Sequence, residues 1–257
     1  MKKQYIREVR AGLARISGMT PGIVTEADLL ALPAPVRRYL QNMGVVGRER
    51  PLNARLVFEG RIRSKPDAWM VFRSEQYNFF DRPTRLFYIA ARKMGIPATG
   101  LHMYKDAKAS MVIRLAGLFK VVDARGKEMD QGETVTVFND MCCMAPATLL
   151  DKNIRWEAID NTSAKASFTN GHITIGATLC FDEAGDLVNF ISNDRFETTD
   201  GKTYHNYPWS TPIGGYTLYD GIRIASEAKL IYHRPDGDFC YGEFTFKEVC
   251  YNIADFK

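Results

Sequence analysis

The sequence predicts a mainly β protein of the α+β class, built on a large curved antiparallel sheet or half-barrel. We expect N-terminal helices beside this sheet and one kinked helix covering its concave face. The hydrophobic period is near 3.6 residues up to residue 47 and near 2 from residue 52 onward. Alternating segments separated by turn residues then follow one another, without the helices that parallel crossovers need. A chain of 257 residues that is 46% hydrophobic can fill one such unit, so we expect 1–257 to form a single domain.

Residues 1–47 are expected to be helical. Apolar residues recur at spacings of three and four from Ile6 to Ile16, which indicates a basic amphipathic helix over 4–16. A second helix begins near Thr25, whose hydroxyl can cap it, and a third runs over 35–43 after two prolines. Gly44 is placed to end that third helix.

Residues 52–257 are expected to form the antiparallel sheet. Leu56, Phe58 and Ile62 alternate with charged residues, as in a strand with one wet face. Hairpins are indicated around the turn residues 182–185 and 235–238.

The segment 132–150 is expected to cover the sheet. Ala68–Phe72 and Leu86–Ala91 are apolar on both faces, so these strands need cover on both sides. Pro146 should break the covering helix and start a short second one. We expect the polar segment 127–132 before it to be a loop. One helical stripe would face the sheet: Val135, Phe138, Met141 or Cys142, Ala145 and Leu149.

Charge and cysteines limit the class of protein. Residues 1–65 hold 13 Lys and Arg against 5 Asp and Glu, whereas the whole chain has a net charge of +4. No zinc-finger or helix-turn-helix spacing accompanies this charge, so we expect no nucleic-acid partner. The five cysteines form no CxxC pair, and no apolar run reaches the length of a membrane span, which favours a cytoplasmic chain. The basic N-terminal helix would make at most weak contact with a membrane surface.

Familiar catalytic motifs are absent from the sequence. There is no GxSxG, GxxxxGK[ST], HExxH or GxGxxG before a helix, and the four histidines lack metal-ligand spacing. We therefore expect no cofactor and no metal. The weak catalytic candidates are His205, in the polar aromatic loop 203–216, and Asp194 as the group that orients it. The alternative is that Tyr207 and Trp209 of this loop only plug one end of a barrel.

The ligand-binding candidates combine apolar side chains with a few polar ones. Asn139 and Asp140 interrupt the covering helix and are expected to face an arginine such as Arg195 or Arg155. The candidates for the wall and mouth of a cavity are Trp69, Phe72, Phe87, Phe138, Asn139, Asp140, Met141, Trp156, His205, Tyr207 and Trp209.

A series of motifs resembles a bacterial family of unknown function. These motifs are LPAPVRRYL, GRIR, GETVTVFND, APATLLD and IRWEAID, in this order along the chain. The chain departs from the family pattern at Val137, where Leu is usual, and at Asp140, where Glu is frequent. The resemblance implies no established activity. It implies an architecture similar to the lipoprotein-carrier type, whose members hold acyl chains in an apolar cavity under a curved sheet.

Three functions follow from these observations. The preferred one is a binding protein that holds a hydrophobic small molecule or lipid in a cavity of the curved sheet. The first alternative is a structural or regulatory partner protein with a filled core, which forms a homodimer through helix 4–16. The second is an acid–base enzyme that uses His205 and Asp194.

Overall fold

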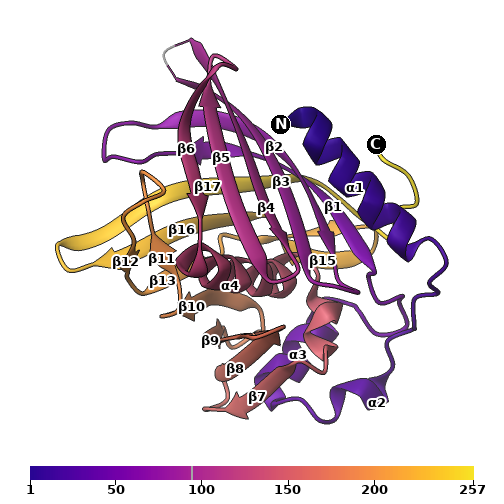
Figure 1. Ribbon diagram of the computed structural model, residues 1–257. Coiled ribbons are helices and arrows are strands. Elements are labelled where there is room, and N and C mark those ends of the chain that lie inside the picture. Colours follow the sequence, from indigo (N-terminus) through magenta and orange to yellow (C-terminus); the bar gives the residue numbers. More distant parts are fainter. Residues whose placement is uncertain (94) are drawn as a thin grey trace.

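The computed structural model describes residues 1–93 and 95–257, and its largest element is a 13-stranded antiparallel sheet. The strand order is β6-β5-β4-β3-β2-β1-β17-β16-β13-β10-β9-β8-β7. This sheet curls into a half-barrel with helices on both of its faces (Figure 1), so the predicted fold class is confirmed.

The first half of the sheet comes from consecutive hairpins: β1 (Asn53–Ile62), β2 (Met70–Phe79), β3 (Thr84–Lys93), β4 (Ile96–Lys105), β5 (Lys108–Leu115) and β6 (Phe119–Arg125). The second half comprises β7 (Ile154–Ala158), β8 (Ser163–Asn170), β9 (Ile173–Phe181), β10 (Leu187–Ser192), β13 (Trp209–Pro212), β16 (Glu227–Arg234) and β17 (Gly237–Tyr251). Two small hairpins lie outside this sheet: β11 (Phe196–Glu197) with β12 (His205–Asn206), and β14 (Tyr216–Tyr219) with β15 (Ile222–Ala225). The hairpins predicted at 182–185 and 235–238 are β9–β10 and β16–β17.

The N-terminal helices are α1 (Lys2–Ile16), α2 (Glu26–Leu29) and α3 (Ala34–Asn42), close to the predicted ranges. Thr25 caps α2 in a reciprocal capping box with Asp28. Gly44 follows α3 with a φ of 71°, a conformation that glycine adopts without a Cβ clash.

Helix α1 packs on the convex face of the sheet, across β2 and β3. Its side chains Tyr5, Val9, Leu13 and Ile16 are buried against outward-facing residues such as Tyr77 and Phe79. The apolar stripe of this basic helix is therefore occupied by its own sheet, and it is not free to contact a membrane or a second subunit.

Helix α4 (Lys127–Met144) lies in the hollow on the opposite face (Figure 1). The chain breaks at Ala145, and Pro146–Leu150 forms a 3-10 helix, so the predicted interruption at Pro146 is confirmed. The residue range predicted for the start of the helix is wrong, because α4 begins at Lys127. Glu128 and Asp130 lie in its first turn, where the helix dipole favours carboxylates, so the polar segment 127–132 is helical.

Two further expectations are corrected by the structure. The segment 203–216 is not a single loop, because Trp209–Pro212 forms β13 between β10 and β16. Polar residues are accommodated there because alternate side chains face opposite sides of the sheet. Helix α4 does not present one apolar stripe: it is buried on all sides, including its polar residues Glu133, Asn139 and Asp140.

Candidate functional site

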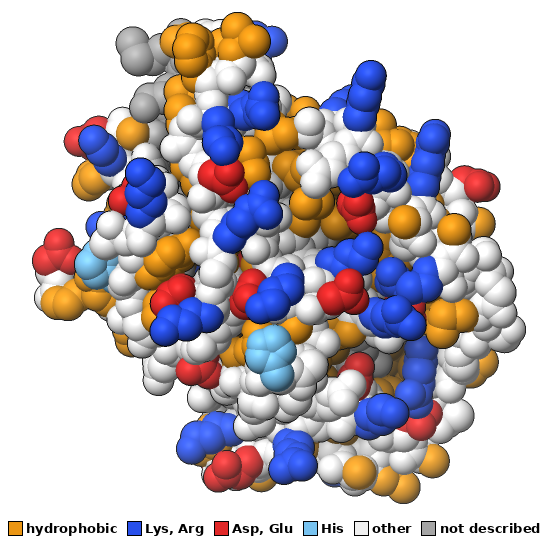
Figure 2. Space-filling view, in the orientation of Figure 1, with side chains coloured by type: hydrophobic (Ala, Val, Ile, Leu, Met, Phe, Trp, Pro, Cys, Tyr) orange, Lys and Arg blue, Asp and Glu red, His pale blue; other side chains and the backbone are white. Residues whose placement is uncertain are grey.

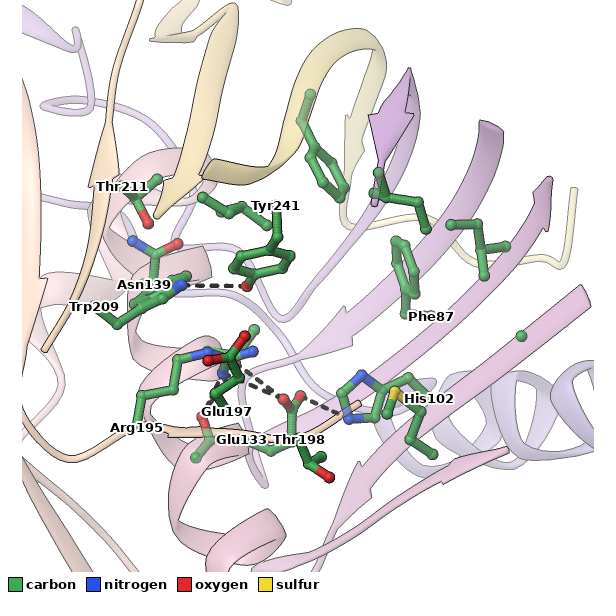
Figure 3. Close-up of a pocket in the computed structure, with 18 of the residues that line it drawn as sticks. Phe87, His102, Glu133, Asn139, Arg195, Glu197, Thr198, Trp209, Thr211 and Tyr241 are labelled. Atoms are coloured by element: carbon green, nitrogen blue, oxygen red, sulfur yellow. Dashed lines mark hydrogen bonds and ion pairs between the residues drawn. The ribbon is translucent and has the colours of Figure 1, made fainter. Parts of the chain in front are cut away.

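A cavity of about 320 Å³ lies in the hollow between α4 and the sheet (Figure 3). Part of the hollow under the sheet is therefore unfilled, beside a packed apolar core. Apolar side chains of β3, β5, β6 and β17 line one part of the cavity, and polar side chains of α4 and of the segment after β10 line the other. The lining residues used below are Gln76, Arg85, Phe87, Ile89, His102, Met111, Ile113, Val122, Glu133, Asn139, Asp140, Arg195, Trp209 and Thr211.

Strand register arranges the inner face of the sheet in three rows of different polarity. The row against α4 is polar: Asn78, Arg85 and Tyr104. The next row is mixed: Gln76, Phe87, His102 and Met111. The third row is almost wholly apolar: Ser74, Ile89, Gly100, Ile113 and Val122. Polarity therefore falls along the strands, from α4 toward the tips of the hairpins.

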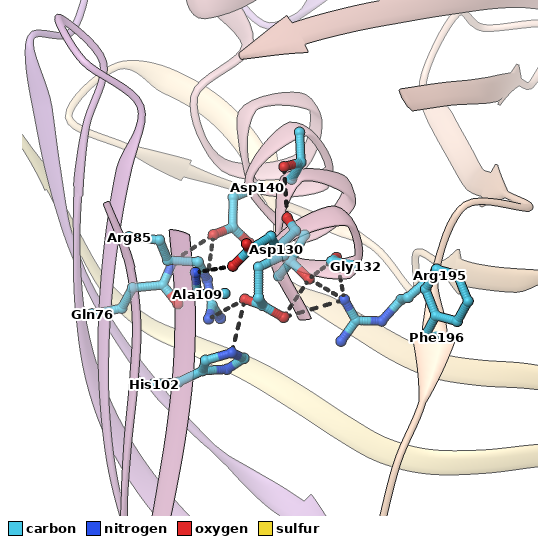
Figure 4. A network of polar contacts seen from close by, with 12 residues as sticks. Gln76, Arg85, His102, Ala109, Asp130, Gly132, Asp140, Arg195 and Phe196 are labelled. Atoms are coloured by element: carbon cyan, nitrogen blue, oxygen red, sulfur yellow. Dashed lines mark hydrogen bonds and ion pairs between the residues drawn. The ribbon is translucent and has the colours of Figure 1, made fainter. Parts of the chain in front are cut away.

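Glu133 is the centre of the polar part of the cavity. Its Oε2 lies 3.5 Å from Nη1 of Arg85, and its Oε1 lies 3.4 Å from Nη1 of Arg195. The hydroxyl of Thr136 donates to Oε1 at 3.1 Å. Nη1 of Arg195 also donates to the carbonyl oxygen of Gly132 at 2.8 Å, which ties the segment after β10 to the first turns of α4. The Glu133 carboxylate thus contacts two arginines, Arg85 of β3 and Arg195 of the segment after β10. Figure 4 shows these two arginines reaching α4 from opposite sides.

Asp140 lies two turns further along the same face of α4. Its Oδ2 accepts hydrogen bonds from Gln76 at 2.7 Å, from Asn78 at 3.0 Å and from Nε of Arg85 at 2.8 Å. The predicted arginine partner of this carboxylate was Arg195 or Arg155, but it is Arg85. Arg85 immediately precedes the apolar stretch 86–91, and the pairing of β3 with β2 brings it beside the two amides.

Burial controls the protonation of the groups around Glu133. Burial lowers the pKa of His102 to about 4, so its imidazole is neutral at pH 7. Burial acts to raise the pKa of Glu133, but the charges of Arg195 and Arg85 and the hydrogen bond from Thr136 outweigh it and hold that pKa below its ordinary value. Burial raises the pKa of Asp140 despite its contact with Arg85. The site therefore holds an ionised Glu133 between two guanidinium groups and a neutral imidazole.

Four buried polar atoms on the wall of the cavity have no hydrogen-bond partner in the described part of the chain. They are Oε1 of Gln76, Nε2 of His102, Nε of Arg195 and Oγ1 of Thr211. Nε2 of His102 comes within 3.2 Å of Glu133 but lacks the alignment of a hydrogen bond. Buried polar groups are nearly always paired, so these four atoms indicate a place for a polar group that the protein does not itself supply.

The cavity lacks the features of a nucleophilic active site in the residues described. Burial raises the pKa of Cys143, which lines the cavity, so its thiol stays protonated and is a poor nucleophile. Residues 1–93 and 95–257 contain no group of three or more His, Cys, Asp or Glu side chains that could hold a metal ion. None of the helices described is long and apolar enough to cross a bilayer.

A Ser-His-Asp chain occurs elsewhere, on neighbouring strands of the second half of the sheet. Nε2 of His233 lies 2.8 Å from Oγ of Ser210, and its Nδ1 lies 2.7 Å from Oδ1 of Asp238. Ser210 is only 1% exposed, and none of the three lines the cavity under the sheet. A nucleophile must reach its substrate, so we interpret this chain as a structural hydrogen-bond network.

The residues predicted from the sequence fall into three groups. Phe87, Asn139, Asp140 and Trp209 line the cavity. Phe72, Phe138 and Met141 are buried in the core around it. Trp69, Trp156, His205 and Tyr207 lie outside it; Trp69 is held between the guanidinium groups of Arg61 and Arg63.

The structure does not bring the two weak catalytic candidates together. Asp194 accepts a hydrogen bond from the backbone of Gly176 at 2.6 Å, whereas the ring of His205 stacks on Tyr207. They line different surface depressions and form no hydrogen bond with each other in the described structure.

Sequence reasoning missed three members of the site, Arg85, His102 and Glu133; it named Arg195, but as a partner of Asn139 or Asp140 and not of Glu133. One signal was present. Glu133, Thr136 and Asp140 are spaced at i, i+3 and i+7, which places them on one face of a helix. A polar stripe on a helix whose other faces are apolar indicates a buried polar site.

Comparisons with known proteins give a family but no activity. The model of a family of unknown function, DUF6544, matches residues 22–244, which confirms the resemblance carried by the motifs. No curated protein matches the chain.

Three solved structures are similar to it in outline. A DUF1329 family protein from Desulfovibrio piger is 11% identical, with a TM-score of 0.47, 87% of this chain covered and 95% of that one. A LolA superfamily protein from Nitrosomonas europaea is 8% identical, with a TM-score of 0.46 and the same coverage. A domain described as an outer membrane lipoprotein-sorting protein, from Vibrio parahaemolyticus, is 9% identical, with a TM-score of 0.44, 78% of this chain covered and 85% of that one.

Proposed function

We propose that this chain, which belongs to the family of unknown function DUF6544, binds one small molecule with an apolar body and an uncharged polar end. The observation that carries the proposal is the cavity under the sheet, with unpaired polar atoms at one part of its wall and an apolar row at the other. The polar end of the ligand would lie near Arg195 and His102, and its apolar body would lie along Ile89 and Ile113.

The size of the cavity favours a single small ligand. Its volume of about 320 Å³ is at the lower end of the range for small-molecule pockets, roughly 300–1,000 Å³. A ligand with several long acyl chains would need a larger space, so one chain or one small ring system fits best.

The charges around the cavity favour an uncharged polar end. Arg85 and Arg195 already contact the carboxylates of Glu133 and Asp140, in a ratio of two cations to two anions. A buried ligand carboxylate or ammonium would add a charge without a partner, which is costly in a region of low dielectric constant. A hydroxyl or amide can instead pair with Nε of Arg195 and Oε1 of Gln76 as acceptor and donor.

The first test is native mass spectrometry of protein purified from cells, followed by solvent extraction. Extra mass that extracts as one neutral amphiphile would support the proposal and identify the chemical class of the ligand.

The second test is displacement of the neutral fluorescent probe N-phenyl-1-naphthylamine by C12 compounds that differ only in their polar end. We expect dodecanol to displace the probe at lower concentration than dodecanoate or dodecylammonium. Equal displacement by all three would contradict the uncharged polar end.

Two variants of β5 test whether the probe binds in the cavity. Ile113→Trp should fill the apolar part of the cavity and abolish probe binding, because Ile113 lines the cavity. Val112→Trp is the matched control: Val112 is the next residue of β5, so its side chain points to the other face of the sheet. If both variants bind the probe as the wild type does, the cavity is not the binding site.

A further inference from the structure

Two neighbouring hairpins end in exposed apolar side chains. The β3–β4 and β5–β6 tips lie side by side at the top of Figure 1, and Ala116 of one donates a backbone hydrogen bond to Pro97 of the other at 2.8 Å. The exposed fractions there are 52% for Ile96, 76% for Leu118, 68% for Phe119 and 46% for Val121. Turn positions usually hold Gly, Pro, Asn, Asp or Ser, so leucine and phenylalanine at a tip require an explanation.

The same hairpins carry an excess of positive charge just behind the apolar tips. Arg92, Arg114 and Lys120 are exposed near the tips, and the one carboxylate on these hairpins is that of Asp123. Asp123 is already bonded to Lys120 at 2.6 Å and Arg125 at 3.2 Å, and Arg92 and Arg114 form no ion pair in the described structure. Figure 2 shows hydrophobic side chains at the top of the molecule with Lys and Arg side chains around them.

The apolar tips lie close to the apolar part of the cavity. Ile113 and Val122 are paired and line the cavity, and Leu115 pairs with Phe119 two residues nearer the tip. At the rise of a strand this is a distance of about 7 Å. The apolar row of the inner face therefore continues almost without a break into the exposed tips.

We infer that these two hairpin tips bind the surface of an anionic lipid bilayer. Leu118, Phe119 and Ile96 enter the interfacial region, and Arg92 and Arg114 contact the anionic headgroups. An exposed apolar cluster with cations behind it has the pattern of an interfacial lipid contact. The site differs from the N-terminal helix, whose apolar stripe is buried against β2 and β3.

The test is flotation of the apo protein with vesicles of phosphatidylcholine alone or mixed 3:1 with phosphatidylglycerol. We expect binding to the anionic vesicles only, weakened when the salt concentration is raised from 0.15 to 0.5 M. Leu118→Ser with Phe119→Ser should reduce the partition coefficient at least about tenfold, given the apolar area of these side chains. Arg92→Gln with Arg114→Gln should reduce it by about fivefold for each cation removed.

Matched controls change the same residue types elsewhere. Leu218→Ser removes a leucine that is 67% exposed, and Lys2→Gln with Lys3→Gln removes two exposed cations of α1. Both controls should bind vesicles as the wild type does. The inference is overturned if the tip variants bind normally, or if the α1 variant loses binding. It is also overturned if the wild type forms a dimer that the tip variants abolish while no vesicles are bound. The test uses no ligand of the cavity, so its outcome is independent of the proposed function.

Discussion

The two faces of the half-barrel are both covered by a helix, but in opposite chemical ways. On the convex face, α1 buries an apolar and aromatic cluster against β2 and β3. On the concave face, α4 buries carboxylates, amides and arginines beside a cavity. Strand β2 takes part in both: Tyr77 and Phe79 point toward α1, while Gln76 and Asn78 point toward α4.

The contrast between the two helices indicates that the polar residues of α4 have a role other than holding the helix on the sheet. Helix α1 is held on the sheet mainly by apolar and aromatic contacts, so a helix can cover a sheet without a buried charge network like that of α4. Buried ion pairs are often no more stabilising than apolar residues of the same volume. Their presence beside unpaired polar atoms is a feature that the proposed ligand would account for.

The largest expected effect is on the concave face. Glu133→Ala should lower the free energy of unfolding by about 3–5 kcal/mol, because it leaves the buried guanidinium of Arg195 without a carboxylate and removes one of the two carboxylates beside Arg85. Urea denaturation measures this. Glu248→Ala, which removes a half-exposed carboxylate paired with Arg55, should cost at most about 1 kcal/mol. If the two variants lose similar free energies of unfolding, the buried network around Glu133 contributes no more to stability than a surface ion pair.

The second effect is a pH dependence of stability that arises from His102 on the concave face. The pKa of His102 is about 4 when folded and 6.5 when exposed, so the unfolded chain binds the extra proton between these values. The free energy of unfolding should therefore fall by about 2–3 kcal/mol as the pH drops from 7 to 4. Asp140 acts in the opposite direction, since a raised pKa favours its protonated, folded form in acid.

Comparing the pH profile of the unfolding free energy between wild type and His102→Gln gives the contribution of the His102 imidazole. This variant should flatten the profile between pH 4 and 6.5, whereas His172→Gln, in the exposed β8–β9 turn, should leave it unchanged. An unaltered profile in His102→Gln would mean that this ring is not held neutral by burial.

On the convex face, the close packing of α1 against β2 can be tested by adding a methyl group at Gly12. A Cβ on Gly12 would lie 2.3 Å from the ring of Phe79, so Gly12→Ala should destabilise the protein by about 1–3 kcal/mol. This loss would occur although alanine is the better helix former by about 1 kcal/mol. Gly18→Ala, where nothing lies within 4 Å, serves as the control. A stabilised Gly12→Ala protein, judged by its thermal melting temperature, would show that α1 is held loosely.

The smallest expected effect is at the edge of α1. Arg15 pairs with Asp81 through two hydrogen bonds of 2.7 and 2.9 Å, the same chemistry as Arg85 with Asp140, but partly in solvent. Asp81→Ala should cost about 0.5–1 kcal/mol in urea denaturation, because the side chain of Arg15 is 23% exposed and water can hydrate its guanidinium once the carboxylate is gone. If Asp81→Ala lost as much unfolding free energy as Glu133→Ala, ion pairs on the two faces would contribute equally to stability.

Much of the fold could be predicted because its signals are local. The spacing from Ile6 to Ile16, the cap at Thr25, the turn residues 182–185 and the break at Pro146 each involve a few neighbouring residues. The start of α4 was missed because polar residues in a first helical turn resemble those of a loop.

The site was largely missed because strand register assembles it. Arg85, His102 and Arg195 belong to three separate segments, and each meets Glu133 only after the sheet has formed. No local period marks such residues. Trp69 was expected at the cavity because it belongs to the apolar stretch 68–72, but it precedes β2 and its ring contacts Arg61 and Arg63 instead.

The strand order has a consequence for synthesis of the protein on the ribosome. Strand β17 joins the two halves of the sheet, and Tyr251 pairs with Ala54, nearly two hundred residues earlier. The early hairpins β1 to β6 can form as they emerge, but β1 keeps an unpaired edge until β17 has been made. Contacts between residues so far apart in sequence form slowly. For most of its translation the nascent chain therefore exposes the unpaired edge of β1, which can pair with a strand of another chain.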